Sequence, residues 1–170
     1  MFRGRLLLGL SMFVVSVVAL GCATAPVAEP APILTSSKTF DADYDDVWNA
    51  LVTGLSDRGH PIQSTDKSSG LIQFTLAYEE KFLGVLLGVE RTIDRYAHRP
   101  TRILAVWDRL EIFASVKVSK HTPGQTMVKV TPIIRGRNNL IGWEELRSKG
   151  TVEKDILGWI EEGLKAKRGK

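Results

Sequence analysis

The side chains of this sequence that could do chemistry are three histidines, a set of acidic residues and one cysteine. His60, His98 and His121 are far apart, without the short spacings that bring imidazoles to one metal ion. Acidic residues occur as adjacent pairs such as Asp45-Asp46, and neighbours point in different directions on a helix or strand. The sequence contains no phosphate-binding glycine loop, nucleophile elbow or dinucleotide fingerprint. We therefore expect no catalytic residue, no metal site and no cofactor.

The single cysteine, Cys22, follows a segment with the features of a secretory signal peptide. Arg3 and Arg5 give the segment a positive start, and residues 6–20 are uncharged and mostly apolar. This run has 15 residues, whereas a helix that spans a bilayer needs about 20. Residues 1–21 are therefore interpreted as a signal peptide.

A resemblance to the lipobox of bacterial lipoproteins is carried by Val18-Ala19-Leu20-Gly21-Cys22. The resemblance implies cleavage between Gly21 and Cys22, transfer of a diacylglyceryl group to the thiol, and acylation of the new amino terminus by a fatty acid such as palmitate. Each buried methylene contributes ~0.8 kcal/mol, so several acyl chains form a stable anchor. The first expected partner is thus a lipid bilayer, through acylated Cys22. A buried core cysteine and an uncleaved signal anchor are the alternatives.

Residues 22–32 are predicted to be a tether. Four alanines and three prolines in the ten residues after Cys22 favour an extended segment that reaches about 3.1 Å per residue. Ala23, rather than an aspartate, follows the cysteine. By resemblance to enterobacterial lipoproteins this implies delivery to the outer membrane, with the folded part facing the periplasm, and anchoring at the inner membrane is the alternative.

The charge distribution argues against a nucleic-acid-binding protein. The formal charge of +4 arises at the two ends of the chain, from Arg3, Arg5 and four basic residues within 165–170. Without these six, 17 basic residues stand against 19 acidic ones, and no basic patch remains. Residues 33–165 are long enough for one real core and are expected to form a single domain, followed by a basic tail at 166–170.

The pattern of this body predicts an α+β fold. Strands are predicted at 35–40, 60–65, 71–78, 109–120 and 126–135, the last two as a long hairpin. Amphipathic helices are predicted from Asp43 to about Arg58, and from a Thr151 cap to residue 164. Between them, residues 79–108 are predicted to be irregular, and 136–150 a loop with one helical turn near Trp143. Hairpins imply an antiparallel sheet, with the two helices packed on one face.

Part of this pattern resembles a known family. The shared features are an aromatic strand end at Phe40, a capped helix with the pair Val47-Trp48, Gly59, and a Lys/Ser/Gly turn into a strand at 66–72. They are similar to the helix-grip domains of small bacterial lipoproteins, such as the domains of BamC, an accessory lipoprotein of the outer-membrane β-barrel assembly machine. The resemblance implies a helix-grip-like two-layer sandwich with a long closing helix.

A candidate interaction surface is predicted where apolar residues interrupt the regular pattern. Residues 82–89 are uncharged, and two glycines weaken them as a strand or helix. Two tryptophans in or near irregular segments are of the type that anchors protein partners. The candidate residues are Phe82, Leu83, Val85, Leu86, Leu87, Trp107 and Trp143. Burial in the core is the alternative for both groups.

Together these features predict a membrane-anchored periplasmic lipoprotein that acts as a non-enzymatic interaction module in outer-membrane assembly or maintenance, with envelope proteins as partners. The alternative is a carrier of a lipid or small hydrophobic ligand, which needs an apolar cavity of about 300 Å³ or more. An enzyme acting on envelope material would instead need titratable groups that converge in a cleft.

Overall fold

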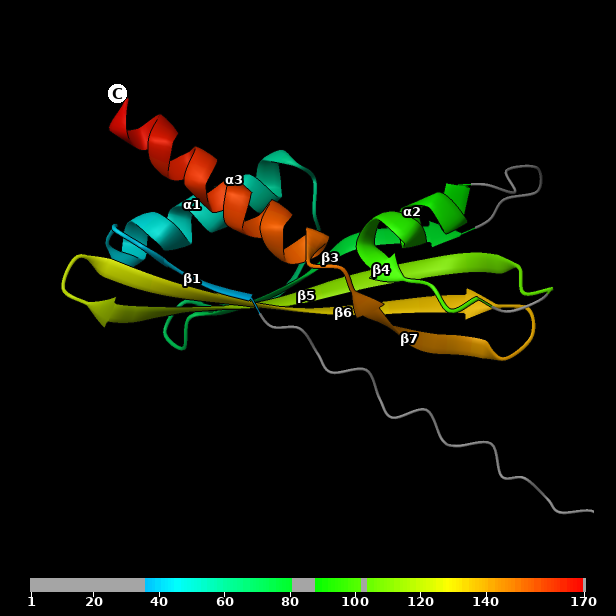
Figure 1. Ribbon diagram of the computed structural model, residues 1–170. Coiled ribbons are helices and arrows are strands. Elements are labelled where there is room, and N and C mark those ends of the chain that lie inside the picture. Colours follow the sequence, from blue (N-terminus) through cyan, green and yellow to red (C-terminus); the bar gives the residue numbers. More distant parts are fainter. Residues whose placement is uncertain (1–35, 81–87, 102–103, 170) are drawn as a thin grey trace, which may run out of the picture.

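Seven antiparallel strands and three helices make up the part of the chain that the computed structural model describes, residues 36–80, 88–101 and 104–169 (Figure 1). The strands are β1 (Ser36–Phe40), β2 (Ile62–Asp66), β3 (Leu71–Glu80), β4 (Ala97–His98), β5 (Trp107–Thr122), β6 (Gln125–Asn138) and β7 (Gly142–Ser148). The helices are α1 (Tyr44–Asp57), α2 (Gly88–Tyr96) and α3 (Thr151–Arg168), and all lie on one side of the sheet. The α+β class with an antiparallel sheet is therefore confirmed, with one helix more than the sequence predicts.

The long β5–β6 hairpin forms the centre of the sheet. β3 pairs with the outer edge of β5, and β2 pairs with β3. The outer edge of β6 is shared by two strands, since β1 pairs with residues 126–130 and β7 with 134–138. Every second side chain along β5 is buried: Leu110, Ile112, Ala114, Val116 and Val118. The predicted hairpin is confirmed, and both of its strands are longer than predicted.

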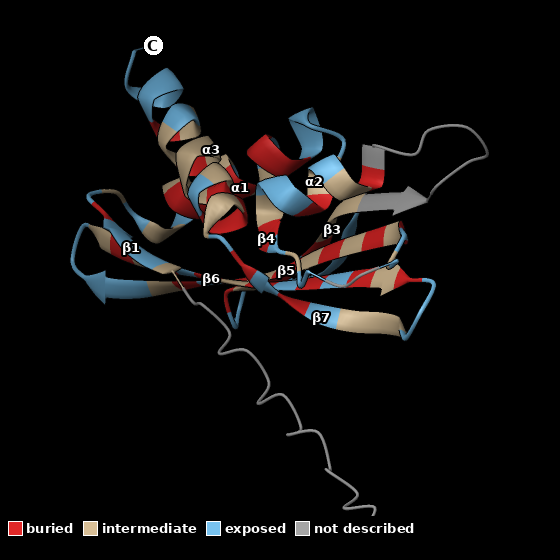
Figure 2. Ribbon diagram, turned by 45° about the vertical axis from the view of Figure 1, so that its right-hand side comes forward, coloured by how far each residue is buried: buried red, intermediate tan, exposed pale blue. Residues whose placement is uncertain are grey.

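Helices α1 and α3 pack side by side over the half of the sheet that contains β1 (Figure 1). Leu51 and Leu55 of α1, like Ile156 and Ile160 of α3, are fully buried, because a spacing of four places them on one helix face. At Gly163 an added Cβ would lie 2.9 Å from the Cβ of Ala50, so the two helices approach closely. Figure 2 shows the buried residues gathered between the helices and the sheet.

The beginning of α3 differs from its prediction. Its N-cap is Gly150, with a left-handed φ of +83°, and Thr151 is the first helical residue. The Thr151 hydroxyl donates instead to the carbonyl of Arg95 at 3.0 Å, which ties α3 to α2. The prediction of Thr151 as the cap is therefore wrong, because its side chain has a tertiary partner. The predicted end of α1 near Arg58 is confirmed: the helix ends at Asp57, and Gly59 follows with a left-handed φ of +69°.

The segment 79–108, predicted to be irregular, contains α2 and the short strand β4. Val89, Ile93 and Ala97 recur every four residues and are buried, so this stretch packs on the core as an amphipathic helix does. The helical pattern is weak in the sequence, because only a few apolar residues recur before Pro100 and the polar side is rich in arginine. The prediction was wrong for 88–98.

The segment 136–150 is also more regular than predicted. β6 continues to Asn138, and β7 returns antiparallel to it. Asn138 closes the turn, since its Oδ1 accepts the N–H groups of Leu140 and Ile141, each at 3.0 Å. Gly142 then supplies a left-handed φ of +81°. The predicted loop and helical turn near Trp143 are therefore wrong.

The predicted basic tail is largely the last turn of α3, which extends to Arg168. Cationic side chains are favourable at this end of a helix. Lys167 forms an ion pair with Asp46, and Arg168 donates to the carbonyl of Asp41 at 2.5 Å. The predicted signal peptide and tether, with Gly21 and Cys22, lie outside the described residues.

Candidate functional sites

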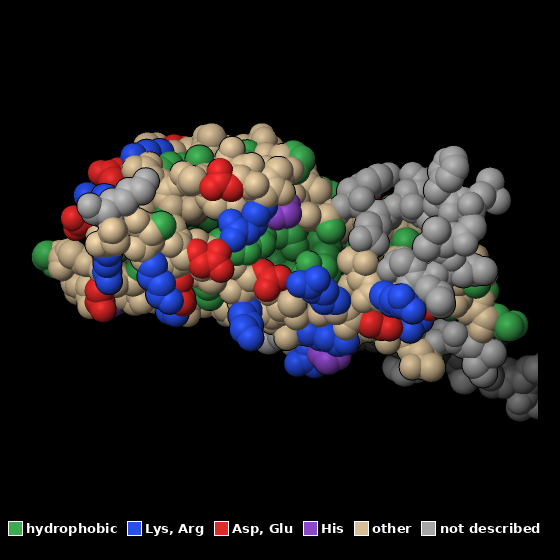
Figure 3. Space-filling model, turned by 90° about the horizontal axis from the view of Figure 1, so that it is seen from above, with side chains coloured by type: hydrophobic (Ala, Val, Ile, Leu, Met, Phe, Trp, Pro, Cys, Tyr) green, Lys and Arg blue, Asp and Glu red, His purple; other side chains and the backbone are tan. Residues whose placement is uncertain are grey.

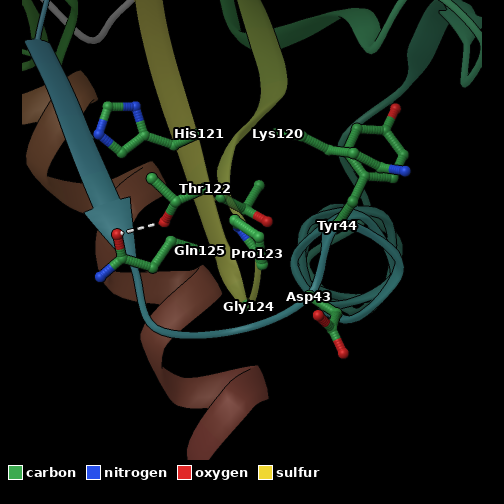
Figure 4. Close-up of a pocket in the computed structure, with 9 residues that line it drawn as sticks. Asp43, Tyr44, Lys120, His121, Thr122, Pro123, Gly124 and Gln125 are labelled. Carbon is green, nitrogen blue, oxygen red and sulfur yellow. Dashed lines mark hydrogen bonds between the residues drawn. The ribbon is translucent and has the colours of Figure 1, made fainter.

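Two adjoining hollows lie where the start of α1 meets the β5–β6 turn and the β2–β3 turn. Their volumes are about 520 and 420 Å³, and Tyr44 and Lys120 line both. In the first hollow Tyr44 comes from α1, and Lys120 and His121 come from the end of β5 (Figure 4). The hollows open to solvent, and we call them together the turn groove.

Tyr44 has a structural role in the turn groove. Its hydroxyl donates to the carbonyl of Lys67 at 2.5 Å, and its ring stacks on Trp48 with centroids 6.1 Å apart. Burial raises the pKa of the Tyr44 phenol above its ordinary value of 10.0. Because its proton is donated to a backbone carbonyl of the β2–β3 turn, this phenol holds α1 against that turn.

An ion pair lines the turn groove. Lys67 lies 2.7 Å from Asp45, and the hydrogen bond with Lys67 lowers the pKa of that carboxyl. Thr122 donates to Gln125 at 2.8 Å across the turn (Figure 4). Within the described ranges, no three His, Cys, Asp or Glu side chains form a group that could hold a metal ion. The contacts described here hold the turns that line this groove in place.

The helix-bearing side of the molecule carries both signs of charge. Basic and acidic side chains are interspersed there, around a hollow in which hydrophobic side chains are visible (Figure 3). Exposed pairs join the elements, among them Arg58 with Glu162 at 2.6 Å. Such pairs contribute little individually, so this face has no dominant charge that would select a partner.

The opposite side of the sheet has no helix over it among the described residues (Figures 1 and 2). Phe113 of β5 lies directly across from Ile133 of β6, and Ile133 is 40% exposed. Gln63 and Arg135 border the same pair, around a hollow of about 280 Å³. We call this surface the open sheet face. Outward-facing apolar residues on strands are the sequence signal for it, because Phe113 alternates with the inward set.

The predicted interaction residues fall into three groups. Phe82, Leu83, Val85, Leu86 and Leu87 lie outside the described residues. Trp107 is 1% exposed and part of the core, so its assignment to a surface was wrong. Trp107 is out of step with the inward alternation of Leu110 and Ile112, but a register shift between Trp107 and Arg109 places it opposite the buried Asn138, and so on the inward side. Trp143 is half-buried beside Arg135, whose guanidinium lies 5.4 Å from the ring centroid.

The register places Trp143 on the open sheet face. It lies opposite Arg137 on β6, while the inward positions of the same strands carry Ile134 and Leu146. Arg135 lies between Trp143 and Ile133 along this face. Apolar and guanidinium groups of this kind anchor protein partners.

Comparison with known proteins adds a distant structural similarity. Neither a protein-family model nor a curated protein matches the sequence. One solved structure similar to this chain is a DUF4468 family protein from Bacteroides ovatus, at 15% identity and a TM-score of 0.36. The alignment covers 66% of this chain and 60% of that protein, which is less than two thirds of its length. Among the described helices, none is long and apolar enough to cross a membrane.

Proposed function

We propose that this chain is a lipid-anchored lipoprotein whose single α+β domain is a non-enzymatic interaction module of the bacterial envelope. The observation that carries the proposal is the open sheet face, on which Phe113 and Ile133 form an apolar pair beside Arg135. An antiparallel sheet normally turns its apolar side to the core and its polar side to water. Large apolar residues on the uncovered side are therefore available to a partner.

The anchor is the second part of the proposal. The lipobox-like residues that end at Cys22 support acylation of that cysteine, and the charged start and apolar run support export. Ala23 favours the outer membrane, with the domain facing the periplasm. A partner there would be an envelope protein engaged in assembly or maintenance of the outer membrane, as in the BamC-like lipoproteins that the sequence resembles.

A carrier function is less well supported. A carrier needs an apolar cavity between the helices and the sheet. Leu51 and Ile156 project into that space from α1 and α3, and Val116 from the sheet, and all three have no exposed surface. These side chains belong to one packed core cluster, which leaves the carrier function with less support.

Metabolic labelling with a palmitate analogue tests the anchor. The full chain should carry the label and separate with the membrane fraction, and Cys22→Ser should lose both properties. Unlabelled, freely soluble wild-type chain that retains residues 1–21 would refute the anchor.

Site-specific photocrosslinking in intact envelopes tests the interaction face. A benzoylphenylalanine at Ile133 should give a discrete adduct that contains an envelope protein. The same group at Asn49, which is exposed on α1, is the matched control. Equal adducts at both positions, or none at position 133, would contradict a role for the open sheet face.

A further inference from the structure

Four large aliphatic residues are exposed together at one end of the sheet. They are Leu104 (81% exposed), Val106 (37%), Leu140 (52%) and Ile141 (53%), and we call them the aliphatic tip. Two come from the loop before β5 and two from the β6–β7 turn. This end lies opposite the β5–β6 turn (Figure 1). Single exposed aliphatic residues are common, but four on two contacting loops form a patch of the kind that marks a protein or membrane contact.

Hydrogen bonds hold the two loops of the tip together. The N–H of Asn139 donates to the carbonyl of Val106 at 3.1 Å, and the N–H of Val106 donates to Oδ1 of Asn139 at 2.7 Å. Nδ2 of Asn139 also donates to the carbonyl of Leu104 at 3.4 Å. Leu104 has a left-handed φ of +65° there. The two loops are therefore joined into one hydrogen-bonded unit.

Three backbone N–H groups of the tip are bonded to asparagine side chains. The N–H groups of Leu140 and Ile141 donate to Asn138, and that of Val106 to Asn139. A polar backbone group costs several kcal/mol in hydrocarbon unless it is bonded within the protein. These three N–H groups can therefore enter an apolar medium without that cost.

We propose that the aliphatic tip inserts into the surface of a phospholipid bilayer. The inference rests on the proposed anchor, which would bring the domain close to a membrane. Ser36 is 14 positions after Cys22, which allows a reach of roughly 43 Å when extended. Ser36 pairs with Val130, and the eight residues from there to Asn138 along β6 span about 27 Å. The tip and the acyl chains can therefore enter the same bilayer.

The chemistry around the tip favours lipid over a protein partner. Residues 104–107 and 138–143 carry no charged side chain that would select a protein. Behind them, Arg137 lies 3.9 Å from Asp108, and Arg135 lies 3.8 Å from Glu111. Because these charges are balanced, insertion should depend on apolar burial and only weakly on anionic lipid.

A fluorescent label at the tip tests this proposal in the full chain. Cys22→Ser removes the only cysteine and the acylation site, so that Leu140→Cys can be labelled alone with a polarity-sensitive dye. On vesicles of phosphatidylethanolamine and phosphatidylglycerol, we expect a blue shift and quenching by a lipid-soluble quencher. A label at His121→Cys, at the opposite end of the sheet, should show neither. Since this chain carries no acyl group, a failure of the anchor proposal does not affect the result.

Substitutions in the labelled chain separate tip insertion from attachment through residues 6–20. Leu104→Asn with Ile141→Asn should abolish most of the shift. Ile62→Asn should retain it, because Ile62 is an exposed aliphatic residue (37%, as for Val106) on the edge strand β2. Circular dichroism checks that each variant is folded. The proposal is overturned if the label at position 140 stays in water while the chain floats with the vesicles, or if the chain does not float. It is also overturned if the shift requires a second copy or an added envelope protein.

Discussion

Gly136 of β6 leaves the space that the indole ring of Trp107 occupies. A Cβ added at Gly136 would lie 2.5 Å from Cζ3 and 2.8 Å from Cε3 of that ring, closer than real Cβ atoms come to other atoms. It would also lie 3.0 Å from Cδ1 of Leu146, so three neighbouring strands meet at this point. The contact explains why Trp107 belongs to the core at the end of the sheet that carries the aliphatic tip.

Gly136→Ala is expected to destabilise the domain by about 2 kcal/mol, because overpacking of a filled core typically costs 1–3 kcal/mol. The free energy of unfolding from urea titrations measures the effect. Gly158→Ala in α3 is the matched control, since nothing lies within 4 Å of its added Cβ. That change should be neutral or stabilise by up to ~1 kcal/mol, because alanine is the better helix former. Equal effects of the two substitutions would contradict the packing argument.

Ser148 organises the junction between β7 and α3. Its hydroxyl donates to Oε2 of Glu153 at 2.9 Å, and its oxygen accepts the N–H of Gly150 at 3.0 Å. Glu153 is 1% exposed. Ser148→Ala removes a partner from a buried carboxylate and should cost about 2–3 kcal/mol. Thermal or urea unfolding will measure the loss, and Ser119→Ala, whose hydroxyl makes only a 3.4 Å contact with Met127, should stay within about 0.5 kcal/mol of wild type.

The parts of the fold with strong apolar periodicity could be predicted from the sequence. β5 alternates over five inward residues, and α1 places Val47, Leu51 and Leu55 on one face. β7 was missed because its inward positions include Ser148 as well as Leu146, so its alternation is weak. The hydroxyl of Ser148 forms a hydrogen bond to Glu153 of α3. Such a tertiary contact cannot be recognised from the local alternation of residues.

The candidate surfaces were harder to predict than the fold. Whether Trp107 is core or surface depends on the missing side chain at Gly136, which is 29 positions further along the chain. The aliphatic tip depends on two loops that meet through the backbone and the side chain of Asn139. Such encounters follow from the register of the sheet rather than from the spacing of residues in either loop. Phe113, by contrast, could be placed on the outward side from alternation alone.

The hydrogen bonds of Asp66 lead us to expect that the folded domain loses stability in acid. Its carboxylate accepts the N–H of Ser68 at 2.9 Å, the hydroxyl of Ser68 at 2.6 Å and the N–H of Ser69 at 3.2 Å, and these bonds lower the pKa of Asp66 to about 2. The folded chain therefore prefers the charged carboxylate. Its stabilising effect should be complete above the ordinary pKa of 3.8 and should disappear as the pH falls toward 2. Urea midpoints of wild type and Asp66→Asn should converge over that range, and a constant difference would contradict the assignment.

His60 predicts a second pH dependence, closer to neutrality. Its ring stacks on Trp159 with centroids 5.1 Å apart, and burial, followed by the charge of Arg58, lowers the pKa of His60 below 6.5. The folded chain therefore prefers the neutral imidazole, so its contribution to stability is present above pH 6.5 and is lost as the pH falls through the lowered pKa. His60→Phe keeps the stacking and removes the titration. Between about pH 8 and pH 5, the unfolding midpoints of wild type should fall more steeply than those of His60→Phe. In NMR, the His60 resonances should titrate below pH 6.5. Parallel midpoint profiles, or a His60 titration at its ordinary pKa, would refute the prediction.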